Sequence, residues 1–133
     1  AETVLVGNNA LAVSAAAKEA ESLGYYPVVL GTQIEGEAKE IAKLYTSMAL
    51  HLKEQTGGYT VAPSLPAALI GGGETTVSLS PNSGKGGRNQ ELALSAALQL
   101  ESLKLAGVVL ASAGTDGTDG PTDAAGAVID AST

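Results

Sequence analysis

A glycine- and aspartate-rich segment near the end of the chain constrains its fold more than any other feature. This acidic loop, residues 114–126, carries Asp116, Asp119 and Asp123 among four glycines. It directly follows the apolar run at residues 107–113, and an apolar run of that length between turn residues is typical of a buried strand. The acidic loop therefore leaves the carboxyl end of a strand, where open α/β sheets place their ligands.

The rest of the chain alternates between strand and helix patterns. Strands are expected at residues 3–6, 26–30, 67–70, 75–79 and 107–113, and helices at residues 37–54 and 88–104 and in the alanine-rich stretch between Asn8 and Gly24. This order predicts an α/β fold, a layered α/β/α domain with a mainly parallel mixed sheet. We expect residues 1–133 to form this single domain, since that length suffices for one core.

Three local features carry finer predictions. Asn8 or Asn9 can cap the first helix, and Gly24 is a typical residue to follow its last turn. Residues 71–74 separate two expected strands in the manner of a hairpin turn. Pro121 can open a short helical turn within the acidic loop.

Charge and composition argue against several classes of function. The net charge of −7 argues against a general nucleic-acid or anionic-membrane surface. The absence of cysteine excludes disulfides, thiolate metal sites and a cysteine nucleophile. No apolar stretch has the length of a membrane span and no signal-peptide pattern opens the chain, so we expect a cytoplasmic protein. The single histidine, His51, falls on the polar side of its expected helix, and we expect it to be solvated.

Residues 84–89, which open the helix expected at 88–104, form a candidate phosphate site. Glycines let backbone N–H groups converge, and a helix N-terminus with free N–H groups binds anions readily. Arg88 can bind phosphate or carboxylate through two parallel hydrogen bonds, and Lys85 adds a mobile charge. The alternative is a flexible turn with solvated cations, in which Glu91 completes a helix cap. The pattern alone does not separate the two.

Carboxylates supply the other candidate groups. Mg²⁺ prefers one or two carboxylates together with water and phosphate oxygens, so Asp116 and Asp119 are candidate metal ligands, and one aspartate could instead accept a proton from a substrate hydroxyl. Glu74 follows a run of glycines that permits close backbone approach, and it could hold Arg88, orient a hydroxyl or bind a metal through water. The structural alternatives are aspartates that shape Asx-turns and a solvated glutamate at a hairpin.

Three segments together resemble the glycerate 2-kinase family in its carboxyl-terminal MOFRL region. They are GGETTV at residues 72–77, GKGGRNQE at residues 84–91 and GTDGTDGPTDAAG in the acidic loop, in the order that the family keeps. VLVGNN at residues 4–9 and EGEA at residues 35–38 extend the resemblance over essentially the whole chain. It implies transfer of the γ-phosphoryl group of ATP to the 2-hydroxyl of D-glycerate, with Mg²⁺, to give 2-phosphoglycerate.

The resemblance also implies roles for individual residues. Catalytic roles fall to Arg88, Glu74 and Asp116, and metal binding to Asp116 and Asp119. Phosphate or substrate contacts fall to Gly72, Gly73, Lys85, Gly86, Gly87, Asn89 and Thr115.

Members of that family are considerably longer than this chain. They carry an N-terminal kinase domain with a glycine-rich segment and a lysine, and their site lies between domains. We therefore expect this chain to supply one wall of the site, with the missing N-terminal domain as its partner, and to be inactive alone. Two alternatives are a stand-alone nucleotide- or anion-binding module and an interface domain without catalytic residues. Saturable Mg-ATP binding without a glycerate effect would favour the first, and an inconsequential Arg88 substitution the second.

Overall fold

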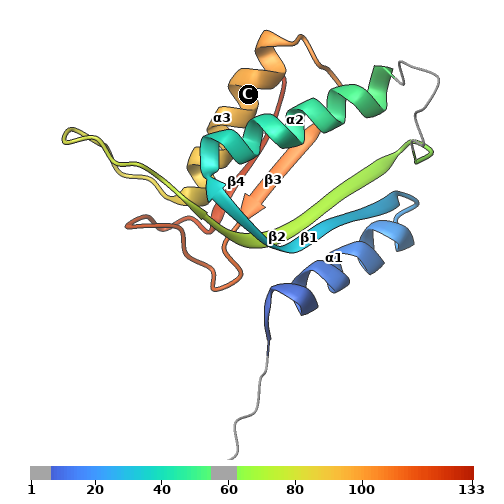
Figure 1. The fold of residues 1–133 in the computed structure, drawn as a ribbon, viewed down its shortest axis with the longest axis horizontal. Helices are drawn as coiled ribbons and strands as arrows, with labels where there is room; N and C mark the ends of the chain where they lie inside the picture. Colours follow the sequence, from blue (N-terminus) through green and yellow to red (C-terminus); the bar gives the residue numbers. More distant parts are fainter. Residues whose placement is uncertain (1–6, 55–62) are drawn as a thin grey trace, which may run out of the picture. The chain divides into compact units, whose positions relative to one another are not determined.

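The structure, a computed structural model, describes residues 7–54 and 63–133. Their elements follow the order α1, β1, α2, β2, α3, β3 and β4 (Figure 1). This pattern confirms the predicted α/β class. The chain divides into two compact units, residues 1–35 with 57–74 and residues 36–56 with 75–133. A single domain over residues 1–133 stays a prediction, and the strand expected at residues 3–6 lies outside the described residues.

The first unit contains helix α1 (Asn9–Ser22) and most of strands β1 (Tyr26–Glu37) and β2 (Ala67–Thr76). The two strands form a two-stranded sheet and run in the same direction (Figure 1). The predicted cap of α1 is confirmed, because the Asn8 side chain accepts a hydrogen bond from the Leu11 N–H at 2.9 Å.

The glycines at residues 71–73 do not form the expected hairpin turn. They continue β2 as one strand through Thr76, where the sequence had predicted two strands. A Cβ added at Gly72 would lie 2.8 Å from Cγ2 of Val13 in α1, and one at Gly73 would lie 2.1 Å from the Ile34 carbonyl oxygen in β1. Glycine is therefore required here for close packing within the sheet and against α1, because any side chain would separate these elements.

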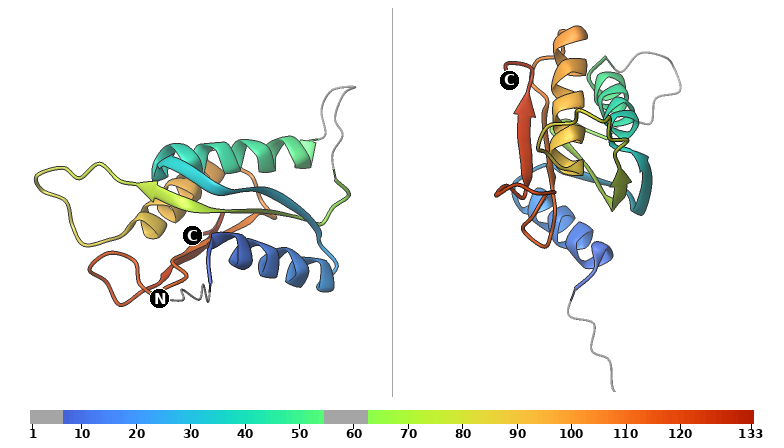
Figure 2. Two further views of the ribbon diagram at one scale, coloured as in Figure 1. Left: turned by 60° about the horizontal axis from the view of Figure 1, so that its bottom comes forward. Right: turned by 90° about the vertical axis from the view of Figure 1, so that its left-hand side faces the viewer.

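The second unit contains helices α2 (Ala38–Glu54) and α3 (Arg88–Ser102) and strands β3 (Val109–Ala113) and β4 (Gly126–Asp130). Helix α3 packs against both α2 and the two strands (Figure 2). Strands β3 and β4 are antiparallel, with Ala111 opposite Val128. Both helices lie where their sequence patterns predicted them.

The core of the second unit consists mainly of small and aliphatic side chains. It comprises Ala38, Ala42, Leu92, Ala93, Ala96, Ala97, Leu100, Leu105 and Ile129. Leu100 is fully buried, whereas Leu94 and Leu98 on the same helix are 58% and 57% exposed. Only one face of α3 is therefore buried within the unit, although the helix is apolar over much of its circumference.

Strand β4 was not predicted from the sequence. The residues around Pro121 form turns and bends instead of the expected helical turn, and the chain then returns antiparallel to β3. A five-residue strand of this kind is specified by its pairing partner rather than by its own short pattern. Within the described ranges, no helix has the length and apolar character needed to cross a membrane.

Candidate functional site

Helix α3 begins without a local side-chain cap. Gly87 occupies the N-cap position and has no side chain to accept from the first turn. The backbone N–H groups of Asn89 and Gln90 donate instead to the carboxylate of Asp119 in the acidic loop, at 3.0 Å to Oδ1 and 2.8 Å to Oδ2. These are the donors that an N-cap side chain normally satisfies, so Asp119 caps α3 from a distant part of the sequence.

The Asp119 carboxylate is saturated with hydrogen bonds inside the protein. Asn89 Nδ2 also donates to Oδ1 and Gln90 Nε2 to Oδ2, each at 3.1 Å. Each oxygen thus accepts two hydrogen bonds, and a carboxylate offers about four acceptor positions in all. Asp119 is only 3% exposed, and burial by itself would raise the pKa of its carboxyl. The hydrogen bonds from Asn89 and Gln90 outweigh this effect and lower the pKa below its ordinary value.

The hydrogen-bond network continues from Asp119 into neighbouring elements. The Ser112 hydroxyl, in β3, donates to Asn89 Oδ1 at 2.7 Å. Gln90 Nε2 donates to Thr122 Oγ1 at 2.9 Å, and that hydroxyl donates to the Asp119 carbonyl oxygen at 2.7 Å. The end of β3, the start of α3 and the acidic loop are therefore joined through side chains.

Glycines allow the two loops to touch. A Cβ added at Gly87 would lie 2.2 Å from Cγ of Asp119, and one at Gly120 would lie 2.2 Å from the Gly86 carbonyl oxygen. Such separations are far inside van der Waals contact, so a side chain at either position would push the loops apart. Of the predicted phosphate-binding glycines, Gly87 is therefore needed for the contact with the acidic loop. Gly86 contributes only its carbonyl oxygen, because a Cβ added there would meet nothing within 4 Å.

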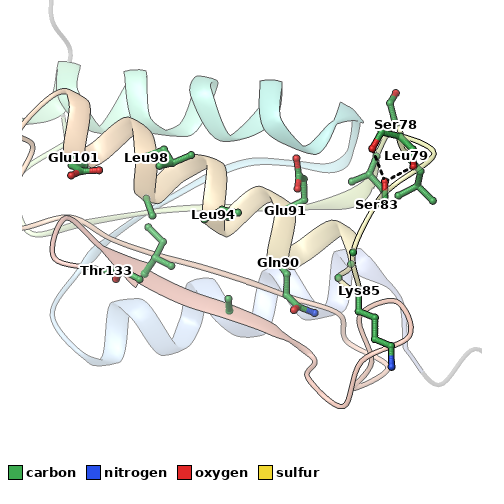
Figure 3. Close-up of a pocket in the computed structure, with 18 of the residues that line it drawn as sticks. Ser78, Leu79, Ser83, Lys85, Gln90, Glu91, Leu94, Leu98, Glu101 and Thr133 are labelled. Atoms are coloured by element: carbon green, nitrogen blue, oxygen red, sulfur yellow. Dashed lines mark hydrogen bonds between the residues drawn. The ribbon is translucent and has the colours of Figure 1, made fainter.

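Three of the charged side chains predicted for the site lie in the two segments that meet here. Arg88 is exposed in the first turn of α3, and its Nη1 donates to the Thr75 carbonyl oxygen at 3.2 Å. Lys85 is exposed, and its ammonium end points away from α3 (Figure 3). Asp116 is exposed next to Thr115, and its Oδ1 accepts from the Thr118 N–H at 3.1 Å, which makes an Asx-turn.

The structure thus brings two of the predicted segments together. Lys85 to Asn89 and the acidic loop meet within the second unit, whereas Glu74, Gly72 and Gly73 belong to the first unit. Glu74 is exposed at the end of β2, and the two glycines pack as described above.

A hollow of about 850 Å³ adjoins the junction (Figure 3). Lys85 and Gln90 lie along its wall together with exposed leucines of α3 and residues of β4. Arg88 and Asp116 are not among its lining residues. The hollow and the cluster of predicted charged residues therefore overlap only in part.

The two predicted metal ligands differ in their fitness for that role. Within the described residues, no group of three or more histidine, cysteine, aspartate or glutamate side chains could hold a metal ion. Mg²⁺ can bind through a single carboxylate that it shares with phosphate oxygens, and exposed Asp116 meets this requirement. Asp119 does not, since its four hydrogen bonds leave no spare acceptor position.

Sequence reasoning missed Gln90 and Thr122, which hydrogen-bond to Asp119, and Ser112, which donates to Asn89 Oδ1. One feature of the sequence could have indicated a distant hydrogen-bond acceptor for the start of α3. A glycine at the N-cap position of a helix leaves the first-turn donors unsatisfied, and an acceptor must then come from elsewhere in the fold.

The fold and the contact between residues 86–90 and the acidic loop define an α/β domain in which a glycine-rich loop and an acidic loop meet at the start of one helix. Residues 67–133, just over half of the chain, match the MOFRL family. The chain belongs to this family.

Proteins similar to this chain include several kinases. The D-glycerate 2-kinase of Thermotoga maritima is 46% identical over 132 residues, which cover 99% of this chain and 30% of the relative. The glycerate 2-kinase of Pyrococcus horikoshii is 40% identical over 97% of this chain and 28% of its own length. The glycerate kinase of Bos taurus is 41% identical over 95% of this chain and 30% of its own length.

Solved structures show the same relationship. A crystal structure of glycerate kinase from Thermotoga maritima superposes with a TM-score of 0.81 at 43% identity, over 98% of this chain and 30% of that one. A Pyrococcus horikoshii protein superposes with a TM-score of 0.80 at 39% identity, over 97% of this chain and 28% of that one. The chain thus spans less than a third of the length of these relatives and matches their carboxyl-terminal part.

Proposed function

We propose that this chain is the carboxyl-terminal part of a glycerate kinase that transfers the γ-phosphoryl group of ATP to the 2-hydroxyl of D-glycerate. The observation that carries the proposal is the similarity, at 40% to 46% identity over nearly the whole chain, to a D-glycerate 2-kinase and a glycerate 2-kinase. The product of this reaction is 2-phosphoglycerate.

The cationic side chains suit the demands of phosphoryl transfer. This reaction depends on positioning and on neutralising charge rather than on covalent chemistry by the protein. Arg88 and Lys85 are exposed on the same loop and helix start, where they can bind phosphate oxygens or the glycerate carboxylate. Because Asp119 already accepts the N–H groups of Asn89 and Gln90, anion binding falls to these side chains rather than to those two backbone donors.

The carboxylates complete the proposed machinery. Asp116 would hold Mg²⁺ together with phosphate oxygens of ATP, and the ion when bound neutralises charge on those oxygens. Arg88, Glu74 and Asp116 are the proposed catalytic residues. Thr115 lies beside Asp116 in an exposed turn, within reach of the same ligand by its position in the chain.

In this proposal, the functional partner of the chain is the remaining two thirds of such a kinase. We expect the 133-residue chain alone to form no ADP from ATP and D-glycerate above a blank without enzyme. Glycerate-dependent ADP formation by the chain alone would overturn the view that it supplies only part of a site.

Ligand binding can be tested on the chain directly. Amide chemical shifts of the ¹⁵N-labelled chain would be followed during titration with Mg-ADP and then D-glycerate. We expect changes at residues 84–89 and 114–123, reduced by Arg88→Ala but not by Lys39→Ala, which removes an exposed cation from α2. Changes confined to other regions, or an equal response from Arg88→Ala, would contradict the proposed site. A response to Mg-ADP without any to D-glycerate would favour a nucleotide-binding module instead.

A further inference from the structure

We propose that Asp119 is a positioning residue whose carboxylate clamps the acidic loop onto the start of α3, and thereby fixes where Asp116 and Arg88 present their charged groups. The significance of those two groups rests on the function proposed above. The clamp itself rests only on the hydrogen bonds and close contacts within the second unit.

The clamp replaces a cap that the helix could have supplied locally. Serine or aspartate at the N-cap position would satisfy the same donors without any distant residue. Here the position is Gly87, and a Cβ on it would collide with the Asp119 carboxyl at 2.2 Å. The missing side chain thus removes the local cap and makes room for the distant one, so closure of the helix end is coupled to folding of the acidic loop.

The clamp leaves little freedom to the residues around Asp116. Strand β3 holds the chain as far as Ala113, and the Gly114 N–H donates to the Ala125 carbonyl oxygen at 2.7 Å. Asp119 holds the other end of the short segment 114–118. Within it, the Asx-turn from Asp116 to Thr118 sets the direction of the Asp116 side chain. Asp116 is thus positioned by attachments on both sides of it.

Arg88 is held by the same interaction. It lies between Gly87, which contacts the Asp119 carboxyl, and Asn89, whose backbone and side-chain N–H groups both donate to that carboxyl. Its guanidinium donates to the Thr75 carbonyl oxygen. Release of Asp119 would free the first turn of α3 and the loop before it, and with them the direction of Arg88.

Hydrogen exchange in the ligand-free chain tests this inference. In Asp119→Ala, we expect the amides of Asn89 and Gln90 to exchange about tenfold faster, because they lose their acceptor. The amide shifts of residues 114–118 should also move towards those of an unstructured loop. Asp123→Asn makes the same charge change at an exposed position of the loop and should leave both readouts unchanged.

A double variant separates positioning from simple capping. Gly87→Ser combined with Asp119→Ala replaces the distant cap by a local one, and the alanine removes the three carboxyl atoms nearest to the new Cβ. We expect slow exchange to return at Asn89 and Gln90 while the shifts of residues 114–118 stay displaced. Recovery of both would show that Asp119 is only a cap and would overturn the inference, as would native loop shifts in Asp119→Ala.

The double variant also covers the case in which Asp119→Ala alone does not fold, since its helix end is capped. No ligand is required for these measurements. A failure of the proposed kinase function, read from the Mg-ADP and D-glycerate titrations, is therefore distinguishable from a failure of the clamp.

Discussion

The substitution Asp119→Asn tests the energetic weight of the buried carboxylate with the least change in shape. Asparagine keeps one acceptor oxygen but places an NH₂ group where the other oxygen accepted two hydrogen bonds. Two of the four hydrogen bonds at this site are then lost, and the remaining two become neutral. Hydrogen bonds to a charged group contribute about 1.5–3 kcal/mol each. Allowing for relaxation and water entry, we expect a loss of about 3 kcal/mol in the free energy of unfolding.

Urea unfolding followed by circular dichroism measures this loss. With a denaturant slope of about 2 kcal/mol per molar, the midpoint at pH 7 should fall by roughly 1.5 M. Asp123→Asn, at an exposed position of the same loop, should change the free energy by less than about 0.5 kcal/mol. If Asp119→Asn proved as stable as this control, the Asp119 carboxylate would not be the main acceptor at the start of α3.

The pH dependence of stability provides a second arm of the same test. Hydrogen bonding lowers the pKa of Asp119 in the folded chain, whereas an unfolded aspartate titrates near 3.9. Its contribution is therefore fully present above about pH 4 and is lost as the pH falls through the lower, folded pKa. Asp130 shows the same direction because of hydrogen bonds from Ser132, so Asp119→Asn should reduce the acid sensitivity without abolishing it. An unchanged acid profile would contradict the assignment.

Two further predictions concern packing. Gly87→Ala should lower the thermal midpoint and reduce the free energy of unfolding by about 1–3 kcal/mol, because the new Cβ meets the Asp119 carboxyl. Gly84→Ala should be nearly neutral, because a Cβ there lies in open space. Equal midpoints for the two variants would refute the close contact of the loops. Leu100→Ala should cost about 3–5 kcal/mol in urea unfolding because the side chain is fully buried. Leu98→Ala, on the exposed face of the same helix, should reduce the free energy of unfolding much less. A similar reduction for both variants would contradict the assignment of the buried face of α3.

Local sequence patterns predicted the helices well. Helix α2 spans Ala38–Glu54 where residues 37–54 were expected, and α3 spans Arg88–Ser102 where residues 88–104 were expected. The Asn8 cap was likewise predictable. Helix periodicity and caps depend on residues within a few positions of each other, so the information needed is contained in a short stretch of sequence.

Features that depend on contacts with distant parts of the chain were predicted wrongly or were missed. Residues 71–73 look like a turn because glycines usually punctuate strands. Gly72 and Gly73, however, are glycine because α1 and β1 approach β2 closely. Strand β4 escaped prediction because its pairing with β3 is what identifies it. The assignment of the acidic loop to the functional site stays a prediction, and the different environments of Asp116 and Asp119 could not be derived from their spacing.

By itself, the sequence determined the α/β class, the helix positions, the family resemblance and the presence of cations and carboxylates in two glycine-rich segments. The tertiary structure alone decided how Asp116 and Asp119 differ. Both follow glycine and threonine in the same motif and are chemically identical residues. One is exposed in an Asx-turn, and the other is buried against four donors at the start of α3. What separates them is which backbone N–H groups the folded chain brings within hydrogen-bonding distance, because the acceptor capacity of a carboxylate used inside the protein is lost to any ligand.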